Sequence, residues 1–197
     1  VRMIRDETEL SVCVSFGLLG ERQYRRLKEA GVSRVHNNLE TSRRYFPSIC
    51  TTHTFEDKIR AIRAAQSAGL SVCSGGIMGL GEEAEDRIDM ALTLRELGIK
   101  SVPVNLMNPI PGTPLADNRR LTKEELERIV AVFRFILPDA SIRLAGGRGI
   151  LEDKGRGCFR SGANAAISGD MLTTAGITVE QDMEMLKELG YRTRYGK

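Results

Sequence analysis

The sequence lacks a long hydrophobic run, an excess of one charge and any closely spaced pair of cysteines. Its apolar runs are too short to cross a bilayer, and no secretory signal pattern is present. Lys and Arg number 29 against 26 Asp and Glu, a net charge of +3, and the two signs are interleaved. This balance gives no reason to expect nucleic acid or a membrane surface as a partner.

The four cysteines are widely spread along the chain, at Cys13, Cys50, Cys73 and Cys158. Without a secretory signal, we expect reduced cytoplasmic thiols or metal ligands rather than disulfides. The 197 residues suffice for one domain with a core. The sequence starts at Val1 in charged, helix-like sequence. We therefore expect it to be a piece of a longer protein.

Short β-branched runs alternate with amphipathic helical patterns. The expected strands are 10–16, 32–39, 70–74, 101–107, 141–145 and, more weakly, 164–168. One helical pattern of apolar residues begins after Thr54, and a second ends near Leu97. A third begins after Thr122, which forms a capping box with Glu125. Thr178 marks the start of a last helix. Strand–helix alternation at this pitch predicts βαβ units and a parallel sheet.

These strands carry polar residues on one face, which is unusual for a parallel sheet covered on both sides. Ser11, Cys13 and Ser15 alternate with Val12 and Val14. An exposed sheet face is one explanation, and a barrel with a polar interior is the better one. A complete (β/α)8 barrel needs about 250 residues, so we predict a partial barrel of roughly the last five strand–helix units.

Candidate site residues fall where these strands end. Cys13 and Cys73 lie late in their strands on the polar face, where thiolates suit iron–sulfur or zinc ligation. Buried cysteines are also common apolar fillers. Arg148 follows two glycines after a strand, where it could bind an anion or a cluster or form a surface ion pair. Cys158 falls in an expected helix and is assigned to the core.

Polar residues crowd the end of the second strand, over 36–41. This segment suits hydrogen bonding to a polar ligand or forms an Asn-rich turn. Asn105 interrupts an otherwise apolar strand and gives a similar hint. The Gly-rich segment 74–82 is expected to be a loop that could contact a nucleoside or an anion. Three prolines stiffen 108–117, either as a rim of the site or as a plain connection.

In order, these segments resemble the biotin synthase family of radical S-adenosylmethionine (SAM) enzymes. The resemblance covers essentially the whole chain. It rests on NLETS (38–42), CTTHT (50–54), VCSGGIMGLGE (72–82), SVPVN (101–105), GTPLADN (112–118), RLAGGR (143–148) and GANAAISG (162–169).

The resemblance implies roles for particular residues. Cys13 and Cys73 match two ligands of an auxiliary iron–sulfur cluster, and Arg148 is matched to its arginine ligand. The substrate-contacting asparagines match the positions Asn38 and Asn105, and the residues near SAM match Glu40, Lys58 and Ile77. Lys58 stands where the family has an arginine, which loses the bidentate fork. Cys50 is either an alternative ligand or a loop thiol without a role.

The family's activity is sulfur insertion into dethiobiotin, with SAM cleaved at a [4Fe–4S] cluster and sulfur supplied by an auxiliary cluster, [2Fe–2S] or a variant. The resemblance further implies a flavodoxin or ferredoxin reductant, a homodimer and a cytoplasmic location. The CxxxCxxC motif of the first cluster does not occur in the 197 residues, so we expect this chain alone to be inactive. The alternatives are a related radical SAM enzyme, such as the hydrogenase-maturation or methylornithine-synthase group, or a non-catalytic remnant.

Overall fold

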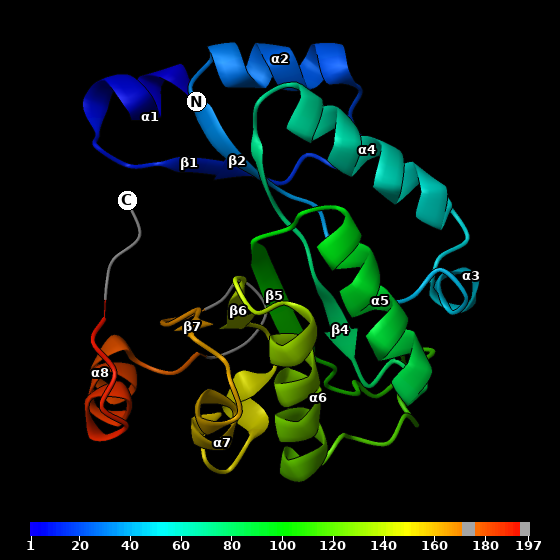
Figure 1. Ribbon diagram of the computed structural model, residues 1–197, viewed down its shortest axis with the longest axis vertical. Coiled ribbons are helices and arrows are strands. Elements are labelled where there is room, and N and C mark those ends of the chain that lie inside the picture. Colours follow the sequence, from blue (N-terminus) through cyan, green and yellow to red (C-terminus); the bar gives the residue numbers. More distant parts are fainter. Residues whose placement is uncertain (171–175, 194–197) are drawn as a thin grey trace.

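The computed structural model describes residues 1–170 and 176–193, which form an open parallel sheet with helices on its outer side (Figure 1). The strand order is β1-β2-β3-β5-β6-β7, and β4 pairs with β5. The strands are β1 (Val12–Val14), β2 (Val32–His36), β3 (Ser71–Cys73), β4 (Gly76–Met78), β5 (Ser101–Leu106), β6 (Ser141–Leu144) and β7 (Ala165–Ala166). All of these pairings are parallel, which confirms the predicted partial barrel.

As expected for βαβ units, helices connect the successive strands except β3 and β4, which follow each other directly. They are α1 (Arg2–Glu7), α2 (Glu21–Glu29), α3 (Phe46–Ile49), α4 (Phe55–Ser67), α5 (Ala84–Glu96), α6 (Lys123–Ile136), α7 (Arg156–Arg160) and α8 (Val179–Glu188), with a short 3-10 turn, η1, at Arg148–Ile150. Threonine capping boxes begin α4, α6 and α8, at Thr54, Thr122 and Thr178. Each threonine accepts a hydrogen bond from a free backbone N–H of the first turn, which explains why the helices begin there.

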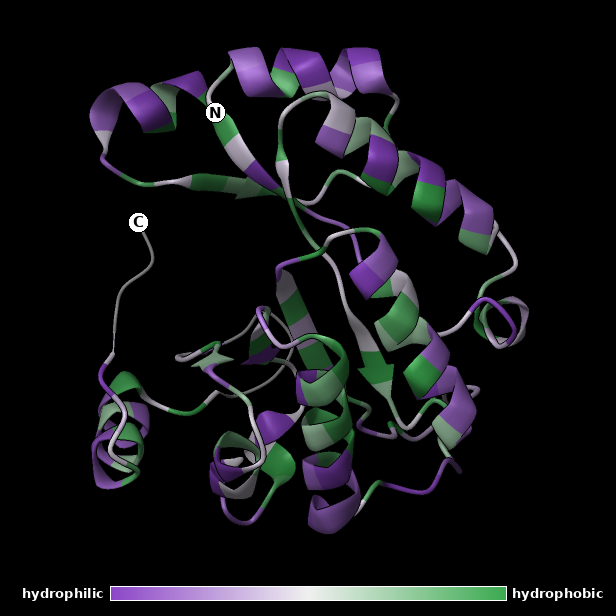
Figure 2. Cartoon of the chain, viewed as in Figure 1, coloured by the Kyte–Doolittle hydropathy of each residue, from purple (hydrophilic) through white to green (hydrophobic). Residues whose placement is uncertain are grey.

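The core lies between the helices and the outer face of the sheet. Val102 and Ile142 on neighbouring strands are fully buried, as are Leu94 of α5 and Phe133 of α6. Figure 2 shows apolar residues along the helix faces that turn towards the strands and hydrophilic residues on the opposite faces. Cys158 on α7 is 1% exposed, which agrees with its assignment to the core. Among the described residues, no helix combines the length and apolar character needed to span a bilayer.

The Gly-rich segment after β3 differs from the expected loop, because Gly76–Met78 form the strand β4. A Cβ on Gly75 would lie 1.9 Å from the carbonyl oxygen of Pro103, and one on Gly76 would lie 2.4 Å from that of Glu40. The glycines thus allow three backbone segments to approach one another closely. Glycine normally weakens a strand, and for this reason composition alone favoured a loop.

Replacing Thr122 by alanine tests the start of α6. Loss of the Thr122 side chain leaves the Glu125 N–H without its 3.2 Å partner, so the free energy of unfolding should fall by about 1 kcal/mol. A urea titration measures it. Arg128→Ala, an exposed change on the same helix, is the control and should alter stability by less than about 0.5 kcal/mol. Equal effects of the two changes would contradict this account of the cap.

Candidate functional site

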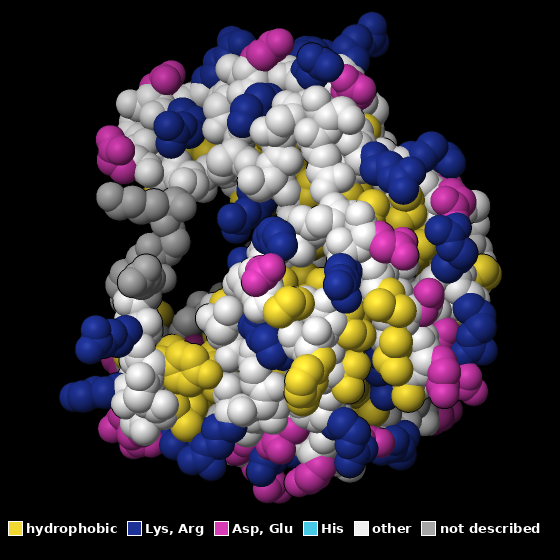
Figure 3. Space-filling model, viewed as in Figure 1, with side chains coloured by type: hydrophobic (Ala, Val, Ile, Leu, Met, Phe, Trp, Pro, Cys, Tyr) yellow, Lys and Arg dark blue, Asp and Glu magenta, His cyan; other side chains and the backbone are white. Residues whose placement is uncertain are grey.

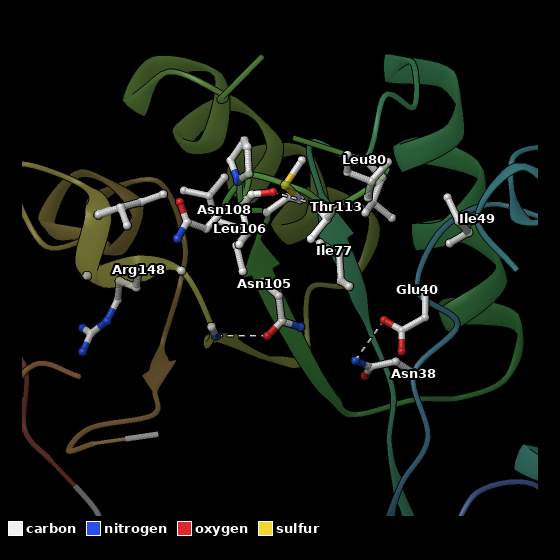
Figure 4. A pocket seen from close by; sticks show the side chains of 18 of the residues that line it. Asn38, Glu40, Ile49, Ile77, Leu80, Asn105, Leu106, Asn108, Thr113 and Arg148 are labelled. Carbon is white, nitrogen blue, oxygen red and sulfur yellow. Dashed lines mark hydrogen bonds between the residues drawn. The ribbon is translucent and has the colours of Figure 1, made fainter. Parts of the chain in front are cut away.

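The carboxyl ends of the strands enclose a pocket of about 980 Å³. Its lining comes from the segments that follow β2, β5, β6 and β7, and from β4 (Figure 4). The proline-rich segment contributes Pro109, Ile110 and Pro114, so it forms part of the wall of the site. Parallel strands bring their carboxyl ends to one edge, and residues distant in sequence therefore meet there. Figure 3 shows the molecule hollowed at its open side, with Lys and Arg side chains at the margin.

The two candidate asparagines are held by backbone groups of neighbouring segments. Asn38 Oδ1 accepts from Gly75 N at 3.1 Å. Asn105 Nδ2 donates to Gly76 O at 3.1 Å, and its Oδ1 accepts from Gly146 N at 3.0 Å. An amide offers two donors and two lone pairs, so each side chain is fixed in orientation and keeps capacity for a ligand. Both asparagines line the pocket, as the sequence analysis expected.

Glu40 also lines the pocket, in a backbone conformation that few residues adopt. Its φ of +71° lies in the left-handed region, and its N–H and C=O bond Gly75 and Ile77 across the junction with β4. Such strain concentrates at functional positions, where the surrounding structure must hold it. Burial raises the pKa of the Glu40 carboxyl, and the charge of Lys58 and a hydrogen bond from Asn38 oppose that effect.

Lys58, on α4, does not line the pocket, but its charge acts on the Glu40 carboxyl. Its Nζ donates to Asn37 Oδ1 at 3.3 Å. The Asn37 Nδ2 is buried and has no partner among the described residues. Ile77 of β4 lines the same side of the pocket as Glu40 and Asn38 (Figure 4). Of the three residues matched to SAM contacts, Glu40 and Ile77 therefore line one region of the pocket, and Lys58 lies outside its lining.

Cys73 lies within a group of polar side chains on the inner face of the sheet. Ser101 Oγ donates to its sulfur at 3.4 Å, and Arg143 Nη1 lies 3.6 Å from the same atom. Arg143 Nη2 also donates to Ser101 Oγ at 2.9 Å. Burial acts to raise the pKa of Cys73, but hydrogen bonds with His36 and Ser101 and the charge of Arg143 outweigh it, and the pKa is lowered. The surroundings thus favour a thiolate.

Cys13 lies on β1, and its side chain is exposed along the open side of the barrel. It pairs in register with Arg34, which in turn pairs with Ser71, two residues before Cys73. Side chains two apart on a strand share a face, so the two thiols share the inner face. Burial and the neighbouring Cys73 raise the pKa of Cys13, and Arg34 and Arg143 act against this rise.

Arg148 does not lie beside the thiols, contrary to its match to the cluster arginine. Its Nη2 donates to Asp182 Oδ2 of α8 at 2.6 Å, and both side chains are buried. The physical reason is its place beyond the strand: the Gly146–Gly147 turn separates it from β6. Arg143 is within β6 and faces Cys73. The geometry therefore favours Arg143 over Arg148 as a cluster ligand.

Arg143 and Ser101 were not among the site residues predicted from the sequence. Alternation along β6 could have found Arg143, because it follows Ser141 by two residues on the polar face. Cys50 is half-buried after α3, with its sulfur 3.4 Å from His53 Nδ1 and 3.5 Å from Thr52 Oγ1. It bonds these neighbours in its own loop, which supports the interpretation as a loop thiol.

Family models match almost the whole chain. The model for the radical SAM superfamily matches residues 1–95, and the biotin and thiamin synthesis associated domain matches residues 103–192. The open parallel sheet with its site at the strand ends is thus that of a radical SAM enzyme. The chain belongs to the biotin synthase family of this superfamily.

Curated relatives agree. The chain is 60% identical over 192 residues to a biotin synthase of Brachyspira hyodysenteriae, and 61% identical over 191 residues to biotin synthase 2 of Corynebacterium diphtheriae. The alignments cover 98% and 97% of this chain, and 58% of each relative. The chain thus spans somewhat more than half the length of these curated relatives.

Solved structures share the fold at low identity. Methylornithine synthase superposes with a TM-score of 0.79 at 21% identity, covering 98% of this chain and 62% of that protein. The FeFe-hydrogenase maturase HydG from Carboxydothermus hydrogenoformans gives 0.77 at 17% identity, covering 95% and 49%. At these identities the likeness concerns the fold alone.

Replacing Glu40 by glutamine tests the effect of burial on its carboxyl group. Because the folded-state pKa of Glu40 is raised by burial, the folded protein holds the proton more tightly than the unfolded chain does. The contribution of Glu40 to stability therefore declines as the pH rises through its ordinary pKa towards the raised value. Glu40→Gln should be more stable than the parent at neutral pH, and the difference should shrink below the ordinary pKa.

Thermal unfolding across this pH range measures the difference. Glu96→Gln on α5, an exposed carboxylate, is the matched control. A Glu40→Gln gain that stays constant down to acid pH would contradict the assignment.

Proposed function

We propose that this chain is part of a biotin synthase, an enzyme that inserts sulfur into dethiobiotin in a SAM-dependent radical reaction. One observation carries the proposal: the buried Cys73 sulfur, whose pKa is lowered, lies 3.6 Å from Arg143 Nη1 on the inner face of the sheet. The strand ends of the same sheet hold a large pocket lined by amide side chains. The names of relatives about 60% identical to the chain point to the same reaction.

The pocket suits a ligand with a polar ring and an aliphatic tail. Asn38 and Asn105 offer amide groups in fixed orientations, which match the paired donors and acceptor of a ureido ring. Four isoleucines supply apolar surface elsewhere in the lining: Ile110, Ile150, Ile167 and Ile177. Dethiobiotin has both features. The asparagines would bind and orient the ring, and the apolar wall would exclude water from the tail.

SAM would occupy the region of Glu40 and Ile77. The partly buried carboxylate can accept hydrogen bonds from a ribose, and Ile77 offers apolar contact for an adenine. Lys58 keeps a positive charge that acts on the Glu40 carboxyl and would act through Asn37, to which its Nζ donates. The volume of about 980 Å³ lies at the upper end of the usual range for ligand pockets.

Cys13, Cys73 and Arg143 would hold an auxiliary iron–sulfur cluster, [2Fe–2S] or a variant. Thiolates are the usual ligands of such clusters. Here two cysteine sulfurs lie on one face of the sheet, with a guanidinium beside the buried one. When bound, the cluster would supply the sulfur atom. Ser101 orients both Cys73 and Arg143 through its hydroxyl. The [4Fe–4S] cluster, a flavodoxin or ferredoxin reductant and a homodimer complete the proposal for the whole enzyme in the cytoplasm.

Removing single ligands from the full-length enzyme tests the cluster site. After anaerobic reconstitution, Cys73→Ala should lose the auxiliary cluster's visible absorption, its iron and biotin formation. The SAM-cleaving cluster should remain. Arg143→Met should retain iron but alter the spectrum, because the buried thiolate loses its neighbouring charge.

Cys158→Ala is the matched control. This thiol is equally buried but lies outside the site, and burial raises its pKa to about 12. If Cys73→Ala kept the auxiliary iron, or Cys158→Ala lost it, the proposed ligand set would be refuted. If the parent made no biotin from dethiobiotin, the proposed reaction itself would fail.

We further propose that the 197 residues alone do not cleave SAM, because they contain no CxxxCxxC motif. Three thiolates leave one iron of a [4Fe–4S] cluster open to SAM, and the four cysteines here are widely spread. After anaerobic reconstitution with iron, sulfide and a reductant, the isolated chain should form no 5′-deoxyadenosine from SAM. Chromatography measures this product, with the full-length enzyme as the positive control. Production of deoxyadenosine by the chain alone would disprove the statement.

A further inference from the structure

A buried ion pair joins the strand-end pocket to the last helix. Arg148 of η1 and Asp182 of α8 make one hydrogen bond of 2.6 Å, with side chains that are 3% and 5% exposed. Nothing in the proposed chemistry uses this pair. Its guanidinium points away from Asn105 (Figure 4).

Stability does not explain the pair. Desolvation of two charges largely cancels their attraction, and well-packed apolar residues of similar volume often serve equally well. The geometry is also incomplete: Arg148 Nη1 and Asp182 Oδ1 are buried without partners among the described residues. A buried pair that contributes little to stability is instead suited to specifying one arrangement of the chain.

The contacts of Arg148 reach both described ends of the segment between β7 and α8. Its Nη2 also donates to Ile167 O at 3.3 Å. Gly169 N donates to Ile177 O at 2.8 Å, which ties the two described stretches together. Ile167 and Ile177 both line the pocket. The guanidinium therefore bonds Ile167 and α8 directly, and Ile177 is tied to this group through the Gly169 hydrogen bond.

The position of Arg148 is itself fixed against the pocket amide. Gly146 N donates to Asn105 Oδ1, and a Cβ on Gly147 would lie 2.0 Å from Leu106 O. Only a residue without a side chain allows this approach, so the turn before Arg148 rests directly on β5. The pair thus fixes the position of the apolar wall relative to Asn105, whose amide would orient the ligand.

We propose that Arg148 and Asp182 are positioning residues, which set the distance between the apolar wall at Ile167 and Ile177 and the amide of Asn105. This inference rests on the proposed function, since dethiobiotin is the ligand whose tail would meet that wall. Arg148 lines the pocket, but its guanidinium is bonded to Asp182 and turned away from Asn105, so the pair would act on the ligand through the wall. The pair selects for the length and shape of the aliphatic part.

The test is the double variant Arg148→Met with Asp182→Leu in the full-length enzyme, which replaces the ions with apolar side chains of similar size. Its melting temperature should stay close to the parent's. Its affinity for dethiobiotin should fall by about tenfold, because the wall is no longer held at a fixed distance from Asn105. Affinity for SAM, at the Glu40 side, should be unchanged. Calorimetry with each ligand separates the two effects.

The control pair is Arg156 with Glu188, which also joins α8 to the barrel but is partly exposed and lines no part of the main pocket. Arg156→Met with Glu188→Leu should leave both affinities at parental values. If the Arg148 and Asp182 double variant binds dethiobiotin as the parent does, or if both pairs weaken binding equally, the inference is overturned.

If the double variant does not fold, a single variant tests the same inference. Asp182→Asn keeps the shape and one acceptor but removes the charge, and it should weaken dethiobiotin binding while sparing SAM binding. Unchanged dethiobiotin binding in this variant would also overturn the inference. Failure of the parent to bind dethiobiotin would instead refute the proposed function, which keeps the two outcomes distinct.

Discussion

The parallel alignment of the strands is the constraint on which the site depends. Because every strand runs in the same direction, each one delivers its last residues to the same edge, and alternate side chains face the same interior. Asn38 and Asn105 come from segments almost 70 residues apart yet line one pocket. A shift of one residue in any strand would turn its polar side chains into the helix-covered core.

The two glycines at the start of β4, Gly75 just before it and Gly76 within it, make this arrangement compact. Gly75 and Gly76 let the backbone pass within contact distance of Pro103 and Glu40, where a side chain would not fit. This approach also holds Glu40 in its left-handed conformation, because its N–H and C=O are both bonded across the junction. The local sequence, the backbone strain and the placement of the carboxylate are therefore parts of one feature.

Much of the fold could be predicted from periodicity and caps. The strands, their polar face and the helices beginning after Thr54, Thr122 and Thr178 follow from local pattern. The strand β4 could not be predicted this way, because it begins in a glycine-rich segment of low β-propensity and it exists through pairing with β5. Asn38, Asn105, Glu40 and Ile77 were predicted as site residues and line the pocket, while their ligands stay a proposal.

The arginines show where sequence matching reached its limit. Arg143 and Arg148 are five residues apart in the same motif, and only the three-dimensional position of the turn between them shows which one faces Cys73. A motif gives the order of residues but not the face of the sheet on which each side chain lies. Alternation along a strand predicts that face, but the alternation no longer applies beyond the end of β6 at Leu144.

Asn105 has a consequence for how the pocket responds to its contents. Its amide bridges β4 and the turn after β6, two segments that pair with opposite sides of β5. A molecule that draws either amide atom towards itself competes with a bond that braces the sheet. Binding of a molecule in the cavity is thus coupled mechanically to the spacing of the strands. Hydrogen exchange with solvent at the Gly146 N–H would report this coupling.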